Sequence, residues 1–328
     1  GHDGSERIGE HRQGDRASRD LCGWRPWRRR RARSGQLSVR AAVPLALLLV
    51  SASCTEKEPT GPGRIVTLET EVAGLSGLTV DEHGALWAAG EDGDAVIRVD
   101  RDTLGVTRYP VSGGPAETDL EAIAWVEGAQ FVLGTETQRK ARLQDVLLAG
   151  RVLGEGFPVR PAGHLDYARW GLTAPDNRGI EGICHVDGLL ILATELVELQ
   201  RGRRWAPVGM FDPKTQTWTA HRVGLSSKTG KLAAMSCKVE RGSVVALAVE
   251  RHFGVSRLLR FQIPRGTEGQ WIESTVAADL AELIEPLPNF EGLAWLDDGS
   301  AVVVTDNKYR RGPRGPSRLY FIPASAIR

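Results

Sequence analysis

Five segments of the chain repeat one short pattern, and this repetition restricts the fold more than any other feature. Each segment has a short motif, an apolar run, a turn that contains glycine, a second apolar run and a final acidic residue. They begin at Ser76, Glu121, Glu181, Ala233 and Glu291, at intervals of 45, 60, 52 and 58 residues. Two β-rich runs joined by a glycine turn predict a β-hairpin. Hairpins that recur roughly every fifty residues are typical of the blades of a β-propeller.

Further alternating segments supply outer strands for these blades. They follow several hairpins, at residues 95–100, 256–263 and 317–323, and alternation of apolar and polar residues is typical of a half-buried strand. We therefore expect residues 64–328 to form an all-β propeller of five four-stranded blades, with room for a sixth blade within residues 143–178.

The two ends of this region complement each other. The last repeat ends at residue 323 without a fourth strand, whereas a spare strand, residues 64–69, precedes the first repeat. Pairing of these ends would close the ring and leave no free sheet edge, which otherwise invites aggregation. An open β-sandwich is the alternative, but it would not require the repeat.

Residues 1–53 have the features of a basic head followed by a signal peptide. They hold eleven arginines, no lysine and five acidic residues. The apolar run at residues 41–50 is too short to span a bilayer but matches the hydrophobic region of a signal peptide. Translation from a Val codon at Val39 would give a compact signal sequence, so we expect residues 1–38 not to be native folded protein. A long basic leader is the alternative.

Three small residues precede Cys54, as in the bacterial lipobox, where the cysteine thiol is acylated. Ser51 departs from the usual pattern, and cleavage that leaves Cys54 without a lipid is the alternative. Residues 54–63 are polar and contain proline and glycine, which predicts a flexible tether. We expect an exported protein, held in the bacterial cell envelope by the lipid at Cys54 or located in the periplasm.

The charge of the body restricts its partners. From Cys54 onward the chain carries 31 basic and 36 acidic side chains. A mildly acidic body is a poor partner for nucleic acid, which requires a clustered basic face. We expect no nucleic-acid partner, a monomer, and membrane contact only through the lipid anchor. Cys184 and Cys237 lack metal-binding spacing, and both a disulfide and two buried thiols are compatible with them.

Acidic residues recur at two places in the repeats. Because the first two strands of a blade run antiparallel, the start of one and the end of the other meet at the same rim of the central channel. The acids at the motif start are Glu121, Glu181 and Glu291, whereas Ser76 and Ala233 occupy that place in the other repeats. The residues at the strand end are Glu91, Glu136, Glu195, Glu250 and Asp306, with Asn307 beside the last.

So many carboxylates at one channel mouth repel each other unless a cation or protons neutralise them. Oxygen ligands in a flexible ring suit Ca²⁺ better than Zn²⁺, which prefers histidine and cysteine. The expected calcium ligands are Glu121, Glu181, Glu195, Glu291, Asp306 and Asn307. The alternative, which stays open, is that these acids cap strands or pair with arginines.

Cations on the same rim predict a small anionic ligand. Arg178 precedes Glu181, Arg139 follows Glu136, and Lys308 follows Asp306. Guanidinium groups pair naturally with phosphate or carboxylate. We expect Arg178, Arg139 and Lys308 to bind the ligand. Solvated loops with local ion pairs are the alternative.

Catalytic candidates come from one strand end. The sequence contains no GxSxG elbow, no HExxH motif and no phosphate loop. Glu250, Arg251 and His252 follow one another at the end of a predicted strand. We expect Glu250 or His252 to act as a general base on water and Arg251 to hold the anion.

Three longer stretches resemble the phytase-type esterase-like β-propeller family. They are NRGIEGICHVDGLLILATELVE at residues 177–198, SVVALAVERHFGVSRLLRF at 243–261 and NFEGLAWLDDGSAVVVTDN at 289–307. The resemblance extends over most of residues 64–328 and implies a secreted or periplasmic propeller that hydrolyses phosphate or other esters with bound Ca²⁺. By motif match it implies roles for Arg178, Glu181, Glu195, Glu250, Arg251, Glu291, Asp306 and Asn307. Ser76 and Ala233 depart from the repeated glutamate.

The sequence leads to two functional hypotheses. The first is a cell-envelope propeller with a calcium-supported rim that binds, and hydrolyses, a phosphorylated or esterified small molecule. The second is a non-catalytic propeller that binds a ligand or a protein and whose rim acids are structural. Acids already paired with amides and arginines would favour the second, and converging acids would favour the first.

Overall fold

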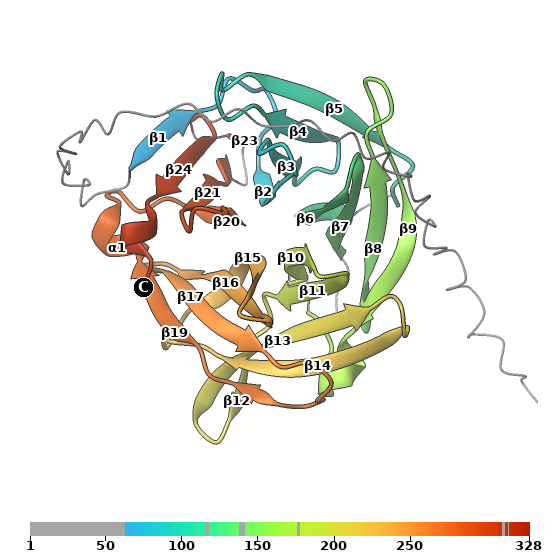
Figure 1. Cartoon of the computed structure of the whole chain (residues 1–328), viewed down its shortest axis with the longest axis vertical. Helices are drawn as coiled ribbons and strands as arrows, with labels where there is room; N and C mark the ends of the chain where they lie inside the picture. Colours follow the sequence, from blue (N-terminus) through green and yellow to red (C-terminus); the bar gives the residue numbers. More distant parts are fainter. Residues whose placement is uncertain (1–62, 116–117, 138–141, 176–177, 310–311, 314) are drawn as a thin grey trace, which may run out of the picture. The chain divides into compact units, whose positions relative to one another are not determined.

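The innermost strand of each blade is the run that begins with the repeated motif. The computed structural model describes residues 63–328 except 116–117, 138–141, 176–177, 310–311 and 314. The inner strands are β2 (Leu75–Val80), β6 (Thr118–Glu127), β10 (Ile180–Val186), β15 (Lys231–Glu240) and β20 (Phe290–Trp295). They contact one another in the closed order β2, β6, β10, β15, β20 and back to β2, and so form the innermost ring of strands (Figure 1).

Each inner strand begins an antiparallel blade. Blade 1 is β2, β3 (Leu86–Gly90), β4 (Ala95–Val99) and β5 (Val106–Ser112). Blade 2 is β6, β7 (Gln130–Thr137), β8 (Gln144–Arg151) and β9 (Phe157–Asp166). Blade 3 is β10, β11 (Leu189–Thr194), β13 (Arg203–Asp212) and β14 (Thr217–Gly224), with short additions β12 (Glu198–Gln200) and β18 (Trp271–Ile272). Blade 4 is β15, β16 (Ser243–His252), β17 (Val255–Ile263) and β19 (Thr275–Asp279). Blade 5 is β20, β21 (Ala301–Thr305), β24 (Arg318–Ile322) and β1 (Arg64–Thr67).

The predicted propeller is therefore confirmed, with five blades. The stretch that left room for a sixth blade supplies β8, β9 and the short helix η1 (Tyr167–Trp170) of blade 2. The spare N-terminal strand closes the ring as expected, because β1 pairs with β24, with Ile65 opposite Tyr320. The remaining described elements are small: α1 (Leu280–Leu283), η2 (Ala324–Ala326) and the hairpin of β22 (Lys308–Tyr309) and β23 (Gly312–Pro313). The predicted signal peptide, the tether and Cys54 lie outside the described residues.

The core consists of five apolar clusters, and each joins two neighbouring blades. Strand β16 shows how the sequence dictates this arrangement. Val244, Ala246 and Ala248 belong to the cluster between blades 3 and 4, whereas Val245 and Leu247 belong to the cluster between blades 4 and 5. Successive side chains of a strand point to opposite faces, so a strand buried on both faces must be apolar at every position.

Among the described residues, no helix has the length and hydrophobicity required to cross a membrane.

Glycine in the repeated motif permits neighbouring inner strands to approach closely. A Cβ atom at Gly182 would lie 2.7 Å from the backbone nitrogen of Met235 in the next blade. A Cβ atom at Gly292 would lie 2.7 Å from the carbonyl carbon of Gly77 and 2.6 Å from the side chain of Val304. The glutamate–glycine pair therefore combines a rim residue with a packing requirement of the ring.

Gly292→Ala is expected to lower the free energy of unfolding by about 1–3 kcal/mol, because the added methyl group overlaps the backbone of blade 1. Gly254→Ala is the matched control, since no heavy atom lies within 4 Å of a Cβ atom built there. Urea denaturation of both variants measures the difference. Equal unfolding midpoints would show that the inner strands can separate without cost.

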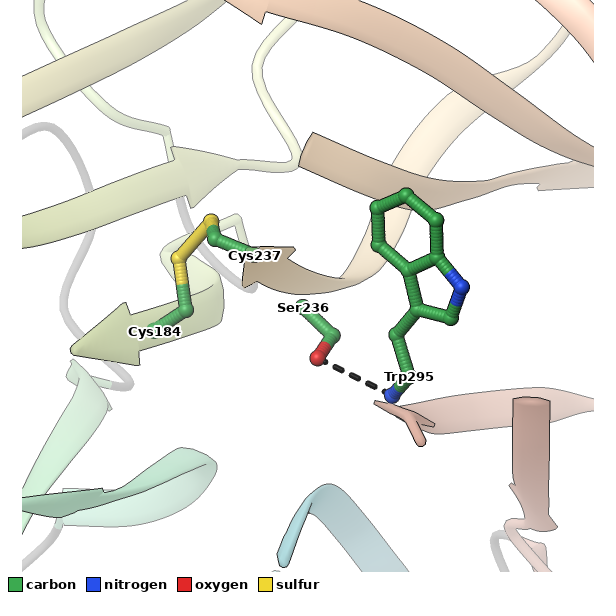
Figure 2. Close-up of a disulfide and its surroundings, with 4 residues drawn as sticks. All are labelled: Cys184, Ser236, Cys237 and Trp295. Atoms are coloured by element: carbon green, nitrogen blue, oxygen red, sulfur yellow. Dashed lines mark hydrogen bonds between the residues drawn. A yellow bond between two sulfur atoms is a disulfide. The ribbon is translucent and has the colours of Figure 1, made fainter. Parts of the chain in front are cut away.

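A disulfide joins the inner strands of blades 3 and 4, which resolves the alternatives left open for Cys184 and Cys237. The cysteines occupy a place in the repeat where other blades form hydrogen bonds. The fourth motif residue of blade 1, Thr79, accepts a hydrogen bond from the backbone N–H of Trp125, the fifth motif residue of blade 2 (3.2 Å). Ser236 does the same for Trp295 (3.0 Å; Figure 2). Cys184 and Cys237 are the fourth and fifth motif residues of blades 3 and 4, so the disulfide takes the place of this hydrogen bond.

Candidate functional site

A β-bulge at the repeated motif forms the rim of the channel. In β6, β10, β15 and β20 the pairing with the second strand skips one residue, which is Glu121, Glu181, Ala233 and Glu291 respectively. A bulge re-aims the side chain of the residue that it leaves unpaired. Four acids lie beside these bulges at the ends of the second strands. Glu136 and Glu250 lie within the last three residues of β7 and β16, and Glu195 and Asp306 directly follow β11 and β21. The predicted meeting of the two acid sets at one rim is therefore present.

Blades 1 and 2 form an acidic sector of the rim. Carboxylate oxygens of Glu91, Asp119 and Glu121 lie within 4.8 Å of one another. The hydroxyl of Ser76 donates to the carboxylate of Glu121 over 2.9 Å. Glu136 accepts a hydrogen bond from the backbone N–H of Gly179. Three carboxylate oxygens at such separations have the chemistry and spacing of ligands to a hard cation.

Burial and mutual repulsion favour the protonated forms of Glu121, Glu136 and Glu181. Burial raises the pKa of Glu121 well above its usual range, and the charges of Glu136 and Glu91 add to the rise. The pKa of Glu181 is also well above its usual range, because of burial first and then of Glu121 and Glu136. Burial raises the pKa of Glu136 to about 7. This sector would therefore gain stability from any bound positive charge.

Blades 3, 4 and 5 form a sector in which the acids are paired. Lys231 forms an ion pair with Glu195, and Arg251 forms one with Glu291, with Nε 3.1 Å from Oε2. Asn289 donates to both Glu291 and Asp306, each over 3.0 Å. Asp306 also accepts from the backbone N–H of Lys308 over 2.6 Å, and burial raises its pKa.

Glu250 is enclosed by a serine loop. Its carboxylate is fully buried and accepts from the backbone N–H groups of Ser226 (3.2 Å) and Ser227 (3.0 Å). Both serine hydroxyls also donate to it. Four donors on one buried carboxylate fix the loop between β14 and β15 against the end of β16.

Cations gather near the paired sector. Burial lowers the pKa of Lys231 to about 8, and the charge of Arg251 adds to the effect. Burial is also the main cause of the lowered pKa of His252, with contributions from Lys231, Arg251, Arg204 and Arg178. These electrostatic couplings place His252 and Arg178 within the field of the same cluster. Glu181 lies between the two sectors, because it interacts with Glu121 and Glu136 as well as with Lys231 and Arg251.

Two predicted residues close the ring between blades 5 and 1. Asn307 accepts from the backbone N–H of Gly74 (2.9 Å) and donates to the carbonyl of Gly315 (2.8 Å). Lys308 lies 3.5 Å from Glu91 and forms a second ion pair with Asp92. Arg139, the remaining predicted ligand contact, lies outside the described residues.

The sequence analysis did not identify Asp119, Lys231 or Asn289 as rim residues. All three stand two positions before the motif start, and Gly74 and Gly179 hold the same place in the other blades. The inner strands β6 and β15 begin at or before this position, so it also faces the rim. The position could have been found in the repeat alignment, but its residue types differ from blade to blade. The sequence analysis also did not identify Arg142, which pairs with buried Asp145 and donates to the carbonyl of Arg178 (3.1 Å).

A separate hollow of about 670 Å³ lies at the opposite ends of blades 4 and 5. Lys238, Trp295 and Asp298 line it beside Cys237. Lys238 already contacts the Trp295 ring, with its nitrogen 4.5 Å from the ring centroid. The convergence of acids and cations, rather than the volume of this hollow, locates the candidate site at the rim.

Among the solved structures compared with the chain, one reaches a TM-score of 0.50, and this likeness concerns the fold alone. The allergen Mala s 1 of Malassezia sympodialis is 11% identical with a TM-score of 0.50, over 80% of this chain and 96% of that chain. A structure described as a putative gluconolactonase is 12% identical with a TM-score of 0.46, over 80% of this chain and 79% of that one. The PQQ-bound aldose sugar dehydrogenase of Streptomyces coelicolor is 13% identical with a TM-score of 0.45, over 79% and 98%. Identities as low as these do not show which activity this chain has.

Comparison with protein families is more specific. No curated protein matches the chain in sequence. The family model described as "Esterase-like activity of phytase" matches residues 70–309, which include the inner strands of all five blades and the whole described rim. The chain therefore belongs to this phytase-like family.

Proposed function

We propose that the rim binds an ester or phosphate anion beside a divalent cation and hydrolyses it. The observation that carries this proposal is the division of the rim into two sectors. Crowded carboxylates lie on blades 1 and 2, and cations cluster around Glu181, Lys231 and Arg251. A phosphate or ester next to a metal ion requires both kinds of group within reach of one small molecule.

Calcium fits the acidic sector. Glu91, Asp119 and Glu121 offer hard oxygen ligands. Burial raises the pKa values of Glu91 and Glu121, and the charges of neighbouring acids add to the rise. Ca²⁺ accepts six to eight oxygens, so backbone carbonyls, water or substrate would complete its shell. When bound there, it would supply positive charge to polarise a phosphoryl or acyl oxygen or a water molecule. Glu121 is the one residue of this trio that the sequence analysis expected to be a calcium ligand.

The chain's own residues would bind the anion and move the proton. Arg178 and the cluster of Lys231 and Arg251 supply donors for a phosphate or carboxylate group. His252 would accept a proton from water, because its lowered pKa keeps the imidazole neutral near pH 7. Glu250 would hold the serine loop and the end of β16 in place, since four donors already occupy its carboxylate.

The second candidate is a non-catalytic binding propeller. The paired state of Glu195, Glu250 and Glu291 favours it, because these acids stabilise the blades without a ligand.

Export and a lipid at Cys54 are part of either proposal. The disulfide supports export, because such bonds persist in oxidising compartments.

Hydrolysis of 4-nitrophenyl phosphate and 4-nitrophenyl acetate by the full chain, with and without Ca²⁺, tests the proposal. Arg178→Gln is expected to raise KM for the phosphate roughly tenfold, because a charge-assisted contact is lost. Arg265→Gln is the matched control, since its guanidinium pairs with Asp187 at the turn that follows β10. Hydrolysis of neither ester at any calcium concentration would exclude catalysis on these esters and favour the binding propeller.

A further inference from the structure

The turn between β16 and β17 exposes an aromatic side chain in an unfavourable backbone conformation. Phe253 is 88% exposed and has a φ of 46°. Bulky residues rarely adopt this left-handed conformation, and such outliers are concentrated at functional sites. The other apolar non-glycine residue with positive φ among the described residues, Leu104, packs against the core between blades 5 and 1. Phe253 has no such packing to offset its conformation.

Phe253 stands at the edge of the cationic part of the rim. It follows Arg251, which is paired with Glu291, and its ring lies 4.0 Å from that of His252, centroid to centroid. His252 in turn lies within the electrostatic field of Lys231, Arg251 and Arg204. The exposed ring is therefore next to the groups that would hold an anion.

A second exposed apolar residue borders the same cluster from blade 3. Leu199 on β12 is 70% exposed and pairs directly with Arg204 on β13. Directly opposed residues of an antiparallel pair share a face of the sheet. The guanidinium of Arg204 donates to the carbonyl of Gly230 over 2.8 Å, which anchors it beside Lys231. Leu199 therefore lies opposite Arg204 on blade 3, and Phe253 lies beside His252 on the neighbouring blade 4.

We propose that Phe253 and Leu199 form an apolar wall of the rim site, and that the ligand carries an aromatic or acyl group next to its anion. This inference rests on the proposed function and narrows its substrate class. A phosphate attached to a polyhydroxylated ring would leave the wall in water, whereas an aryl or acyl group would cover it. Covering exposed apolar surface is favourable in proportion to its area.

Two non-hydrolysable anions with the same charged group test the inference. Phenylphosphonate and methylphosphonate are titrated calorimetrically into the full chain in the presence of Ca²⁺. The wild-type chain is expected to bind phenylphosphonate roughly three- to tenfold more tightly, as an aromatic contact contributes. Phe253→Ala is expected to remove this preference without changing the affinity for methylphosphonate, and Phe253→Trp to retain it. Leu153→Ala is the matched control, because Leu153 is 59% exposed on the turn that follows β8.

The outcomes separate the two proposals. Equal binding of both phosphonates by the wild-type chain, or an unchanged preference in Phe253→Ala, would overturn the apolar wall and leave the anion site intact. Binding of neither phosphonate would overturn the anion site and the wall with it. The thermal unfolding midpoint of Phe253→Ala confirms folding, and it should not fall, because Phe253 contributes little to the core.

Discussion

Calcium is expected to raise the thermal unfolding midpoint of the full chain, and Glu121→Gln is expected to remove most of this rise. A ligand at 100 times its Kd stabilises the folded state by roughly 2.7 kcal/mol, which is about 5–10 °C for a domain of this size. The physical reason is the crowding of Glu91, Asp119 and Glu121. Scanning calorimetry of chelator-treated protein, with and without Ca²⁺, measures the effect.

The effect of pH on this stabilisation follows from Glu136, whose charge acts on Glu121 of the trio. The folded-state pKa of Glu136, about 7, lies above its ordinary value of 4.5. A raised carboxyl pKa contributes stability that is present at low pH and is lost as the pH rises through the folded-state value. Without calcium, the free energy of unfolding should therefore fall between about pH 4.5 and 7. The stabilisation by calcium should increase over the same range, because the negative charge that Glu136 gains lies near Glu121 and attracts the ion.

Comparison of Glu121→Gln with and without calcium distinguishes loss of the ion from loss of the fold. Without calcium, Glu121→Gln should be at least as stable as the wild-type chain, because a neutral amide carries no charge that this buried position and its acidic neighbours would disfavour. Glu82→Gln is the matched control, since Glu82 is exposed and outside the trio. If calcium stabilises Glu121→Gln as much as the wild-type chain, the ion binds elsewhere or the acids are purely structural.

The fold could be predicted from the sequence because it is repetitive. Each blade reproduces the same hairpin, and the strand order follows from the repeat and from the unpaired end strands. The alternation along β16 also reveals a strand buried on both faces. The sixth blade that the sequence left possible is not formed by the described residues, because β8, β9 and the short helix η1 occupy most of that stretch as parts of blade 2.

The candidate site was less predictable, because its chemistry depends on contacts between blades. The sequence indicated that Glu195 and Glu291 reach the rim, but not that Lys231 and Arg251 of blade 4 neutralise them. Nor did it indicate that Asp119, two residues before Glu121, lies with Glu91 of blade 1. The repeat determines which positions face the rim, whereas the pairing of charges depends on the neighbour that each blade meets. The assignments of metal, base and anion contacts accordingly remain predictions that these experiments test.

Loss of the disulfide is expected to have the largest effect on stability. The bond closes a loop of 53 residues, for which chain entropy gives a stabilisation of about 4 kcal/mol. Cys184→Ala/Cys237→Ala should therefore unfold at a clearly lower urea concentration than the oxidised wild-type chain. Reduction of the wild-type chain should give a similar shift.

The repeat provides a matched variant that separates the covalent bond from the contact it replaces. Cys184→Ser/Cys237→Ala places a hydroxyl where Thr79 and Ser236 accept hydrogen bonds from the next blade. This variant should recover about 1 kcal/mol relative to the double alanine variant, because one hydrogen bond between blades is restored. Equal unfolding midpoints for the serine and alanine variants would show that residue 184 is not equivalent to the other two positions. An unchanged midpoint in both would show that the two cysteines are not bonded in the folded protein, and the support that the disulfide gives to export would be lost.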